Sequence, residues 1–344
     1  MASNLQSLVQ LSARLAQNPD LVQAGGGNTS IKENGTLWVK ASGKWLIRAA
    51  DEEMFLPVPL AGILQHVSEN RDYKSEYVVA GGVSLRPSVE TAMHAVLPQS
   101  VVLHFHSVNT IAWAVRENAP AALPEILNGL RWAWLPYVHP GLPLARAIQD
   151  LVEQRPDVLI LGNHGLVVAG ESCQAAENTL QEVERRLQSS RREAPQPDLE
   201  ALTRLASAGG WQLPENEEIH ALGADRRFAE TLARGTLFPD QCVYVGPAAA
   251  LVRAGEPLVA GIERYAKRFA CPPKVVLVEG SGVLVSKDLT KGGRELLACV
   301  QRVIERIPEG ESVTYLGDAE VARLLNWDAE KYRIAIAREQ EAAN

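Results

Sequence analysis

The run Val101-Val-Leu-His-Phe-His106 joins three aliphatic residues to two histidines that are separated by one phenylalanine. Its aliphatic start predicts a buried strand. Because successive side chains of a strand point to opposite faces, we expect His104 and His106 on one face and Phe105 on the other. Two imidazoles on one rigid face are the beginning of a site for zinc or a similar divalent ion. Such a site needs a third protein ligand and an open position for catalysis.

A third histidine stands between two further apolar runs. Val158-Leu-Ile-Leu161 and Leu166-Val-Val-Ala169 flank the polar turn residues Gly162-Asn-His-Gly165, so His164 is predicted at a hairpin tip or a bulge. A lone histidine in this position is more often an ordinary turn residue. Beside a His-x-His pair it becomes the candidate for the missing third ligand.

The residues before the paired histidines predict a helix. Pro87-Ser-Val-Glu90 opens a helical pattern that continues to Leu97, with Ser88 as a plausible N-cap and Glu90 in the first turn. Helix capping by Ser88 and a favourable interaction of Glu90 with the helix dipole are enough to explain why these residue types occur here, without a catalytic role. Consecutive elements usually pack as neighbours, however, so the start of this helix is expected beside the histidine strand.

A glycine run near the N-terminus is followed by a hairpin signal. Gly25-Gly-Gly-Asn-Thr-Ser30 precedes two β-prone runs that are joined by Asn34-Gly35. Asn-Gly is the strongest short hairpin signal, because both turn residues need positive φ. The glycines form either a tight turn or a loop whose backbone N–H groups reach an anion. The loop alone favours the tight turn.

The composition is that of an ordinary globular protein, with 46% hydrophobic and 22% charged residues among 344, enough for two domains. A net charge of −7 argues against nucleic acid as a partner. No apolar run reaches the length of a membrane helix and the start lacks a secretory signal, so we expect a cytoplasmic protein without a membrane partner. The four cysteines are far apart, which favours neither disulfides nor a thiolate zinc site.

A polar, proline-bearing stretch at residues 189–198 predicts a domain boundary. We expect a first domain at residues 1–192, a linker at 193–198 and a smaller α+β region at 199–344. In that region the pattern predicts a strand at 241–245, a hairpin at 274–286 and two helices that begin near Asp318 and Asp328. Gly280-Ser-Gly282 lacks the further glycine of a dinucleotide-binding loop. No group of residues there assigns a role to the region.

Taken together, five motifs resemble those of the class II aldolase/adducin family in order and in approximate spacing. They are Gly27-Asn-Thr-Ser30, Ser42-Gly43, Pro87-Ser-Val-Glu90, His104-Phe-His106 and Asn163-His-Gly165. Each motif is weak alone, and the resemblance over roughly residues 1–190 rests on all five being in register. It implies an α/β fold, namely a three-layer α/β/α domain with a mostly antiparallel central sheet. It also implies a homo-oligomer, with a tetramer favoured.

The resemblance further implies a site. It places Zn²⁺, or another divalent metal, on His104, His106 and His164, and it makes Glu90 the catalytic acid/base. The residues that match the family's phosphate cradle are Gly27, Asn28, Ser42, Gly43 and Ser88.

The chain departs from the small members of the family in one position, because Val89 stands where they usually carry a second serine. Lys40 or Lys44 is a candidate replacement as an anion contact. The glycine run and the surroundings of Lys40 and Glu90 resemble more closely the aldolase part of rhamnulose-1-phosphate aldolase/dehydrogenase-type proteins. So do Gly235-Thr-Leu-Phe-Pro-Asp240 and the segment from Leu324 to Tyr332. We expect no dehydrogenase domain in this chain.

Four histidines remain outside the expected ligand set. His94 is expected to have a structural role or to support a ligand, since it lies on the helix after Glu90 rather than on the ligand strand. His139 lies in a loop between two prolines and is expected to bind no metal. His66 and His220 are expected at the surface.

The expected activity is that of a class II, metal-dependent aldehyde-lyase acting on a small phosphorylated sugar. Breaking a carbon–carbon bond beside a carbonyl leaves an enediolate, whose charge a divalent ion stabilises. The family also contains epimerases, decarboxylases and dehydratases of sugar phosphates or sugar acid phosphates, and these remain alternatives. A non-catalytic scaffold like adducin is a further alternative, although the retained histidines and Glu90 count against it.

Overall fold

The computed structural model describes residues 4–71, 85–207 and 209–342, with side chains up to Ile336 in the last helix. The chain divides into two compact units. Unit 1 comprises the described residues up to Ala114, Asn118–Gln188 and the last helix from Lys331. Unit 2 comprises Val115–Glu117 and Ser189–Glu330.

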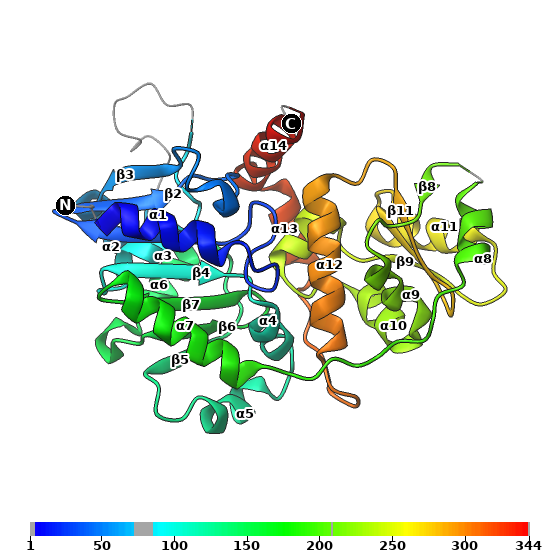
Figure 1. Ribbon diagram of the computed structural model, residues 1–344, viewed down its shortest axis with the longest axis horizontal. Helices are drawn as coiled ribbons and strands as arrows, with labels where there is room; N and C mark the ends of the chain where they lie inside the picture. Colours follow the sequence, from blue (N-terminus) through cyan, green and yellow to red (C-terminus); the bar gives the residue numbers. More distant parts are fainter. Residues whose placement is uncertain (1–3, 72–84, 208, 343–344) are drawn as a thin grey trace. The chain divides into compact units, whose positions relative to one another are not determined.

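Unit 1 is built on a seven-stranded sheet with the order β3-β2-β1-β4-β7-β6-β5 (Figure 1). Neighbouring strands are antiparallel except for β5 and β6, which are parallel. The expected α/β fold with a mostly antiparallel sheet is therefore confirmed. The strands are β1 (Asn28–Glu33), β2 (Thr36–Lys40), β3 (Phe55–Pro59), β4 (Val101–Phe105), β5 (Trp132–Leu135), β6 (Val158–Leu161) and β7 (Gly165–Gly170).

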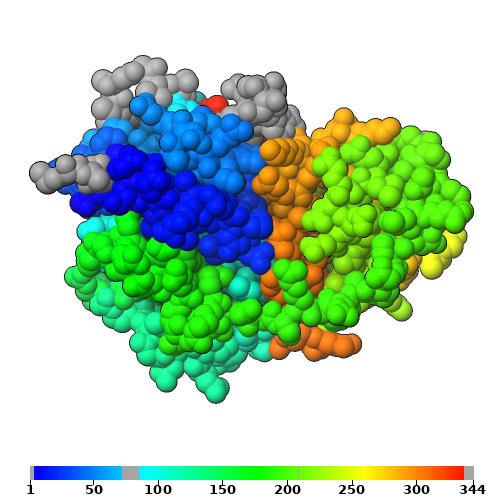
Figure 2. All heavy atoms as spheres, viewed as in Figure 1, coloured from blue at the N-terminus to red at the C-terminus, as the bar shows by residue number. Residues whose placement is uncertain are grey.

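Helices cover both faces of this sheet. One layer contains α1 (Asn4–Leu15), α4 (Val108–Ala114), α5 (Ala119–Ile126) and α7 (Cys173–Leu187), and the other contains α2 (Leu60–Ser68), α3 (Thr91–Val96) and α6 (Leu142–Gln149). Short 3₁₀ turns lie at Leu46–Arg48 and Val152–Gln154. On the surface, α1 and α7 lie side by side (Figure 2), and the Arg14 guanidinium on α1 makes a two-pronged ion pair with Glu177 on α7.

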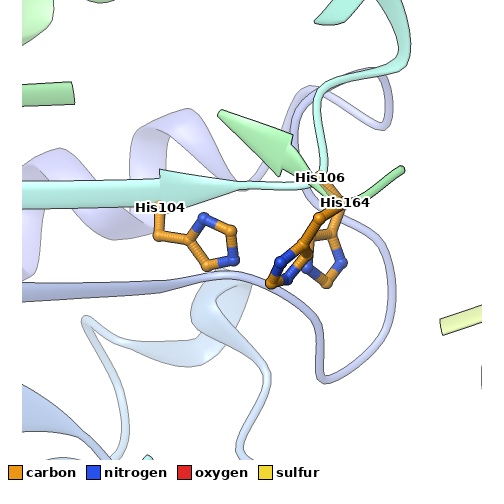
Figure 3. Close-up of side chains that lie close together, drawn as sticks. All are labelled: His104, His106 and His164. Atoms are coloured by element: carbon orange, nitrogen blue, oxygen red, sulfur yellow. The ribbon is translucent and has the colours of Figure 1, made fainter. Parts of the chain in front are cut away.

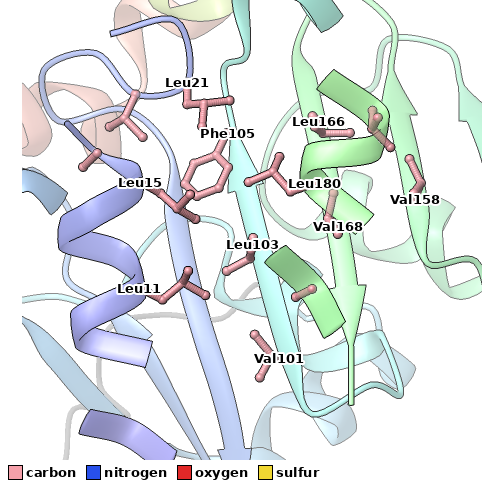
Figure 4. Close-up of a cluster of buried hydrophobic side chains, with 14 of the residues drawn as sticks. Leu11, Leu15, Leu21, Val101, Leu103, Phe105, Val158, Leu166, Val168 and Leu180 are labelled. Carbon is pink, nitrogen blue, oxygen red and sulfur yellow. The ribbon is translucent and has the colours of Figure 1, made fainter. Parts of the chain in front are cut away.

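The central strand β4 separates two hydrophobic cores. Val101, Leu103 and Phe105 pack against α1 and α7 (Figure 4), whereas Val102 belongs to the core beneath α3 and α6. His104 shares the face of Val102, as the two-residue period of a strand requires. The predicted separation of His104 from Phe105 is thus confirmed.

Local turn chemistry explains the two hairpins of unit 1. Asn34 and Gly35 have φ values of 50° and 77° between β1 and β2, as an Asn-Gly turn requires. The predicted hairpin at residues 158–170 also forms. Its turn contains Asn163 at φ 50°, and the backbone N–H of His164 donates to the carbonyl of Leu161.

Unit 2 has a four-stranded sheet with the order β8-β11-β10-β9. Its core gathers residues from several elements, among them Leu202, Val252, Tyr265, Val276 and Leu284. The strands are β8 (Trp211–Gln212), β9 (Ala250–Val252), β10 (Val275–Val278) and β11 (Gly282–Ser286). The helices are α8 (Leu199–Ala206), a 3₁₀ turn at Glu217–His220, α9 (Ala221–Ala224), α10 (Arg226–Arg234), α11 (Leu258–Phe269), α12 (Lys291–Glu305) and α13 (Asp318–Asn326).

The last helix, α14 (Asp328–Ala342), begins in unit 2 and continues in unit 1. The division therefore differs from the expected region 199–344 at its C-terminal end. The physical reason is a contact within unit 1, where the Arg86 guanidinium lies 4.5 Å from the centre of the Tyr332 ring.

The prediction of a strand at residues 241–245 is wrong. Gln241–Val245 forms one π-helical turn, labelled η5, in which all five residues are buried. The Gln241 side chain holds the preceding loop, because its Oε1 accepts from Leu237 N at 2.8 Å and its Nε2 donates to Gly235 O at 3.0 Å. Because all five residues are buried, the segment shows no alternation between buried and exposed side chains. The local pattern therefore does not distinguish helix from strand here, and tertiary contacts decide.

The expectation that His66 and His220 lie at the surface is also wrong. Both are buried. His220 is held from within unit 2, because its Nδ1 accepts from the backbone N–H of Val283 at 3.2 Å. Among the described helices, none combines the length and apolar composition that crossing a membrane requires.

Candidate metal centre

Three histidines at the ends of two neighbouring strands converge at one end of the sheet of unit 1 (Figure 3). His104 lies in β4, His106 directly follows it, and His164 occupies the turn before β7. Because β4 and β7 are antiparallel partners with Phe105 opposite Leu166, the end of β4 meets the start of β7. The ring centres are 4.9–5.4 Å apart, and one nitrogen of each ring lies within 4.8 Å of the others.

The donor set of this cluster fits a divalent ion such as zinc. Zinc binds imidazole nitrogen at about 2.0–2.1 Å, so two nitrogens on one ion are about 4 Å apart at most. The ligand nitrogens of the cluster, all within 4.8 Å of one another, lie close to that separation. His104 already presents the correct nitrogen, because its Nδ1–H donates to the carbonyl of Leu166 at 3.0 Å and leaves the lone pair on Nε2. All three side chains are buried.

Two glycines allow the backbone to pack tightly against the ligand strand. A Cβ on Gly165 would lie 2.6 Å from the carbonyl oxygen of Phe105. Gly27 has a φ of +64°, and a Cβ there would lie 2.9 Å from the carbonyl oxygen of His104. A larger residue at either position would push the glycine loop or β7 away from the histidines.

Glu90 faces the histidine cluster from the N-cap position of α3. Its Oε2 lies 3.3 Å from His104 Nε2, and its Oε1 lies 3.3 Å from His164 Nε2. Burial raises the pKa of this carboxyl group, but electrostatic interaction with the neighbouring imidazoles and a hydrogen bond from Asn28 outweigh burial and lower the pKa to about 2. Glu90 is therefore ionised at neutral pH.

The residues behind Glu90 form a buried hydrogen-bond chain. Asn28 Nδ2 donates to Glu90 Oε2 at 2.8 Å. The other end of the amide, Oδ1, accepts from Nε2 of His94. The second ring nitrogen of His94, Nδ1, lies 2.7 Å from the hydroxyl of Ser30.

The segments of the expected phosphate cradle also meet. Ser42 N donates to Arg86 O at 2.8 Å, and Ser88 N donates to Lys40 O at 3.0 Å. The end of β2 therefore pairs with the chain just before α3. The hydroxyl of Ser88 accepts from the backbone N–H of Glu90 at 3.2 Å, so Ser88 supports the carboxylate residue directly.

The two lysines that were candidate anion contacts have other partners. Lys40 is buried, and its ammonium group donates to the carbonyls of Gly25 and Gly27 at 2.8 and 2.9 Å. Lys40 therefore stabilises the conformation of the glycine loop from the buried side. Lys44 makes an ion pair with Glu52 at 2.8 Å.

Sequence reasoning missed part of the hydrogen bonding that supports the site. Ser30 and His94 were not linked to Asn28, although Ser30 follows it by two residues on a strand and His94 follows Glu90 by four on a helix. Those spacings place each pair on one face. Glu184 was missed altogether. From α7 it accepts from the Ser107 hydroxyl and from Asn109 Nδ2, which holds the turn after His106.

Comparison with known proteins identifies similar chains. Residues 6–190 match the family described as Class II Aldolase and Adducin N-terminal domain. The chain is 29% identical over 192 residues to the uncharacterized oxidoreductase YuxG of Bacillus subtilis, covering 51% of this chain and only 27% of that protein. It is 30% identical over 181 residues to methylthioribulose-1-phosphate dehydratase of Microcystis aeruginosa, covering 46% of this chain and 80% of that enzyme.

Two solved structures are similar over a comparable part of the chain. The N-terminal class II aldolase domain of a conserved Thermoplasma acidophilum protein is 26% identical, with a TM-score of 0.49, over 54% of this chain and 93% of that one. The L-fuculose-1-phosphate aldolase of Thermus thermophilus is 19% identical, with a TM-score of 0.39, over 62% of this chain and all of that one.

Proposed function

The chain belongs to the class II aldolase and adducin family, and we propose that it is a metal-dependent lyase that breaks or forms a carbon–carbon bond in a small phosphorylated sugar. The observation that carries this proposal is the convergence of three imidazoles with one ionised carboxylate. Both carboxylate oxygens of Glu90 lie 3.3 Å from a ring nitrogen of the cluster. An adducin-like scaffold has no need of such an arrangement.

In this proposal His104, His106 and His164 hold a zinc or another divalent ion. When bound, the ion supplies a Lewis acid that stabilises negative charge on substrate oxygen atoms. The histidines hold that charge at the end of β4, where the substrate's reacting end must lie. Burial of the three side chains keeps bulk water away from the ligand nitrogens, which strengthens electrostatic interactions there.

Glu90 is the proton carrier of the proposed reaction. In this proposal the Glu90 carboxylate, whose two oxygens each lie 3.3 Å from a ring nitrogen of the cluster, begins as the base and receives a proton from the substrate. Returning that proton completes the cycle. The hydrogen bond from Asn28 holds Oε2 in place and leaves Oε1 facing His164.

The phosphate of the substrate binds in the cradle of Gly27, Asn28, Ser42, Gly43 and Ser88. Pairing of the end of β2 with residues 86–88 brings Ser42 and Ser88 into adjoining segments. A bound phosphate supplies binding energy at a distance from the reacting atoms and thereby orients them.

We assign catalysis to the domain at residues 1–192, with a linker at 193–198, and assign no role to the region 199–344. Family membership supports a homo-oligomer, with a tetramer favoured, that works in the cytoplasm.

A dehydratase is the second candidate. The relative from Microcystis aeruginosa, named as a methylthioribulose-1-phosphate dehydratase, shares 30% identity over 80% of its length. A divalent ion and one carboxylate also suit loss of water next to a carbonyl, because both reactions create negative charge on the same oxygen. Epimerases and decarboxylases use a similar apparatus, but no specific observation favours them here.

Product analysis distinguishes the candidates. The full chain, loaded with zinc, manganese or cobalt, is incubated with a panel of ketose 1-phosphates. Appearance of dihydroxyacetone phosphate and an aldehyde supports the lyase, whereas loss of one water without chain cleavage supports the dehydratase. Activity that survives removal of the metal by a chelator contradicts both. Glu90→Gln serves as the control for background cleavage.

A further inference from the structure

The hydrogen-bond chain behind Glu90 joins one strand to one helix. Asn28 and Ser30 lie two residues apart on β1, so their side chains share a face of the sheet. Glu90 and His94 are four residues apart across the start of α3, so they lie on one side of the helix. The imidazole of His94 thus spans Asn28 and Ser30 while Glu90 meets the other end of the Asn28 amide.

The hydrogen-bonding capacity of each group determines which atoms donate and which accept in this series of hydrogen bonds. Asn28 turns its Nδ2 toward Glu90 and donates to Oε2 at 2.8 Å. Its Oδ1 then faces His94 Nε2, which must carry the ring hydrogen. Nδ1 of His94 consequently holds a lone pair, and the hydroxyl of Ser30 donates to it.

We infer that His94 is a positioning residue that locks the Asn28 amide in one orientation and thereby fixes Glu90 against the ligand histidines. His94 itself touches neither substrate nor metal. The inference depends on the proposed function only in taking Glu90 as the reacting carboxylate.

Burial makes the alternative arrangements costly. His94 and Ser30 are completely buried, and Asn28 is 6% exposed, so water does not replace a lost partner. A flipped amide would place its carbonyl against the Glu90 carboxylate, with two acceptors facing each other. The opposite tautomer of His94 would place a lone pair against Oδ1. Burial also lowers the pKa of His94 to about 3, which keeps the ring neutral with a single hydrogen.

The orientation of the Asn28 amide by His94 is expected to affect catalysis but not metal binding. The ligand nitrogens belong to other residues, so the cluster does not need His94 in order to hold an ion. Proton transfer by Glu90 does need a fixed carboxylate, because the distance and angle to the substrate determine the rate. Loss of the hydrogen bond from His94 is therefore expected to lower kcat while metal content changes little.

The first test needs no substrate and uses the wild-type chain without metal. Long-range proton–nitrogen NMR correlation of ¹⁵N-labelled histidine identifies which ring nitrogen of His94 carries hydrogen, with the signal assigned in the wild-type chain by connecting the ring to its own backbone resonances. We expect hydrogen on Nε2 and a bare, hydrogen-bonded Nδ1 from pH 6 to 8. Hydrogen on Nδ1, or a doubly protonated ring, overturns the inference even if the variant fails to fold.

The second test compares two variants in the metal-loaded enzyme. His94→Leu removes both ring nitrogens, and we expect kcat to fall about 10-fold to 100-fold. His94→Gln keeps an N–H donor near the position of Nε2, and it should recover most of the lost kcat. Metal content, measured by elemental analysis, should equal that of wild type in both variants.

Two outcomes contradict the inference in this second test. They are a wild-type kcat in His94→Leu and loss of the metal from either variant. A wild-type chain that turns over no sugar phosphate contradicts the proposed function instead. In that case the NMR measurement of the His94 tautomer still tests whether His94 holds the Asn28 amide in one orientation.

Discussion

Asn28 and His104 are direct cross-strand partners, because the antiparallel register of β1 and β4 places them opposite each other. The end of the glycine loop therefore lies beside the first ligand histidine. Asn28 bonds the carboxylate that faces that histidine. One strand pair thus brings three parts of the site together, namely the loop, the ligand and the proton carrier.

Replacing one ligand should remove the metal. We expect His106→Ala to purify with less than about one tenth of the wild-type metal content, because two imidazoles leave a labile, incomplete site. Activity should fall in parallel. Elemental analysis of the purified chain measures the first effect. The matched control is His220→Asn, which retains an acceptor for Val283 N and should keep the full metal content.

Gly165→Ala should destabilise unit 1. The new Cβ would lie 2.6 Å from Phe105 O, so β4 and β7 must separate. We expect the free energy of unfolding to fall by about 1–3 kcal/mol, which is typical of overpacking. Urea denaturation followed by circular dichroism measures it. Gly317→Ala, where a Cβ meets nothing within 4 Å, is the control. Equal stabilities of the two variants would show that the close contact does not exist.

Lys40→Met should loosen the glycine loop. The substitution keeps much of the buried side-chain length but leaves the carbonyls of Gly25 and Gly27 without the Lys40 ammonium donor. An unsatisfied buried carbonyl costs about 1–3 kcal/mol, so we expect KM for the sugar phosphate to rise about tenfold or more. Steady-state kinetics measures it. Lys44→Met removes only a partly exposed ion pair and should leave KM unchanged. The reverse ranking would make Lys44 the anion contact.

The stability of the chain should depend on pH through Lys32. Burial lowers the pKa of this amine from 10.5 to about 7, although Glu171 partly opposes the shift. Between those values the unfolded chain binds the proton and the folded chain does not, so stability rises as pH increases from about 7 to 10.5. Denaturation at pH 7, 8 and 9 should show this rise in wild type and a smaller one in Lys32→Met. Parallel curves for the two proteins would refute the assignment.

Much of the architecture could be predicted because it depends on neighbours in the chain. Asn34-Gly35 defines a hairpin through its own allowed φ values, and the alternation in β4 separates His104 from Phe105. Residues 241–245 show where such reasoning ends, because a run that is buried on all sides has no alternating pattern. Only contacts with other segments made it a π-helical turn.

The amino-acid sequence alone determined which side chains are available at the site and which of them share a face, since those properties follow from residue type and from periods of two and 3.6 residues. Tertiary structure decided their partners. Lys40 binds carbonyls of the glycine loop, and His94 meets Asn28 from another element. Such pairings depend on strand order and helix packing across more than ten residues of chain, and local conformational preferences carry no information about separations of that length.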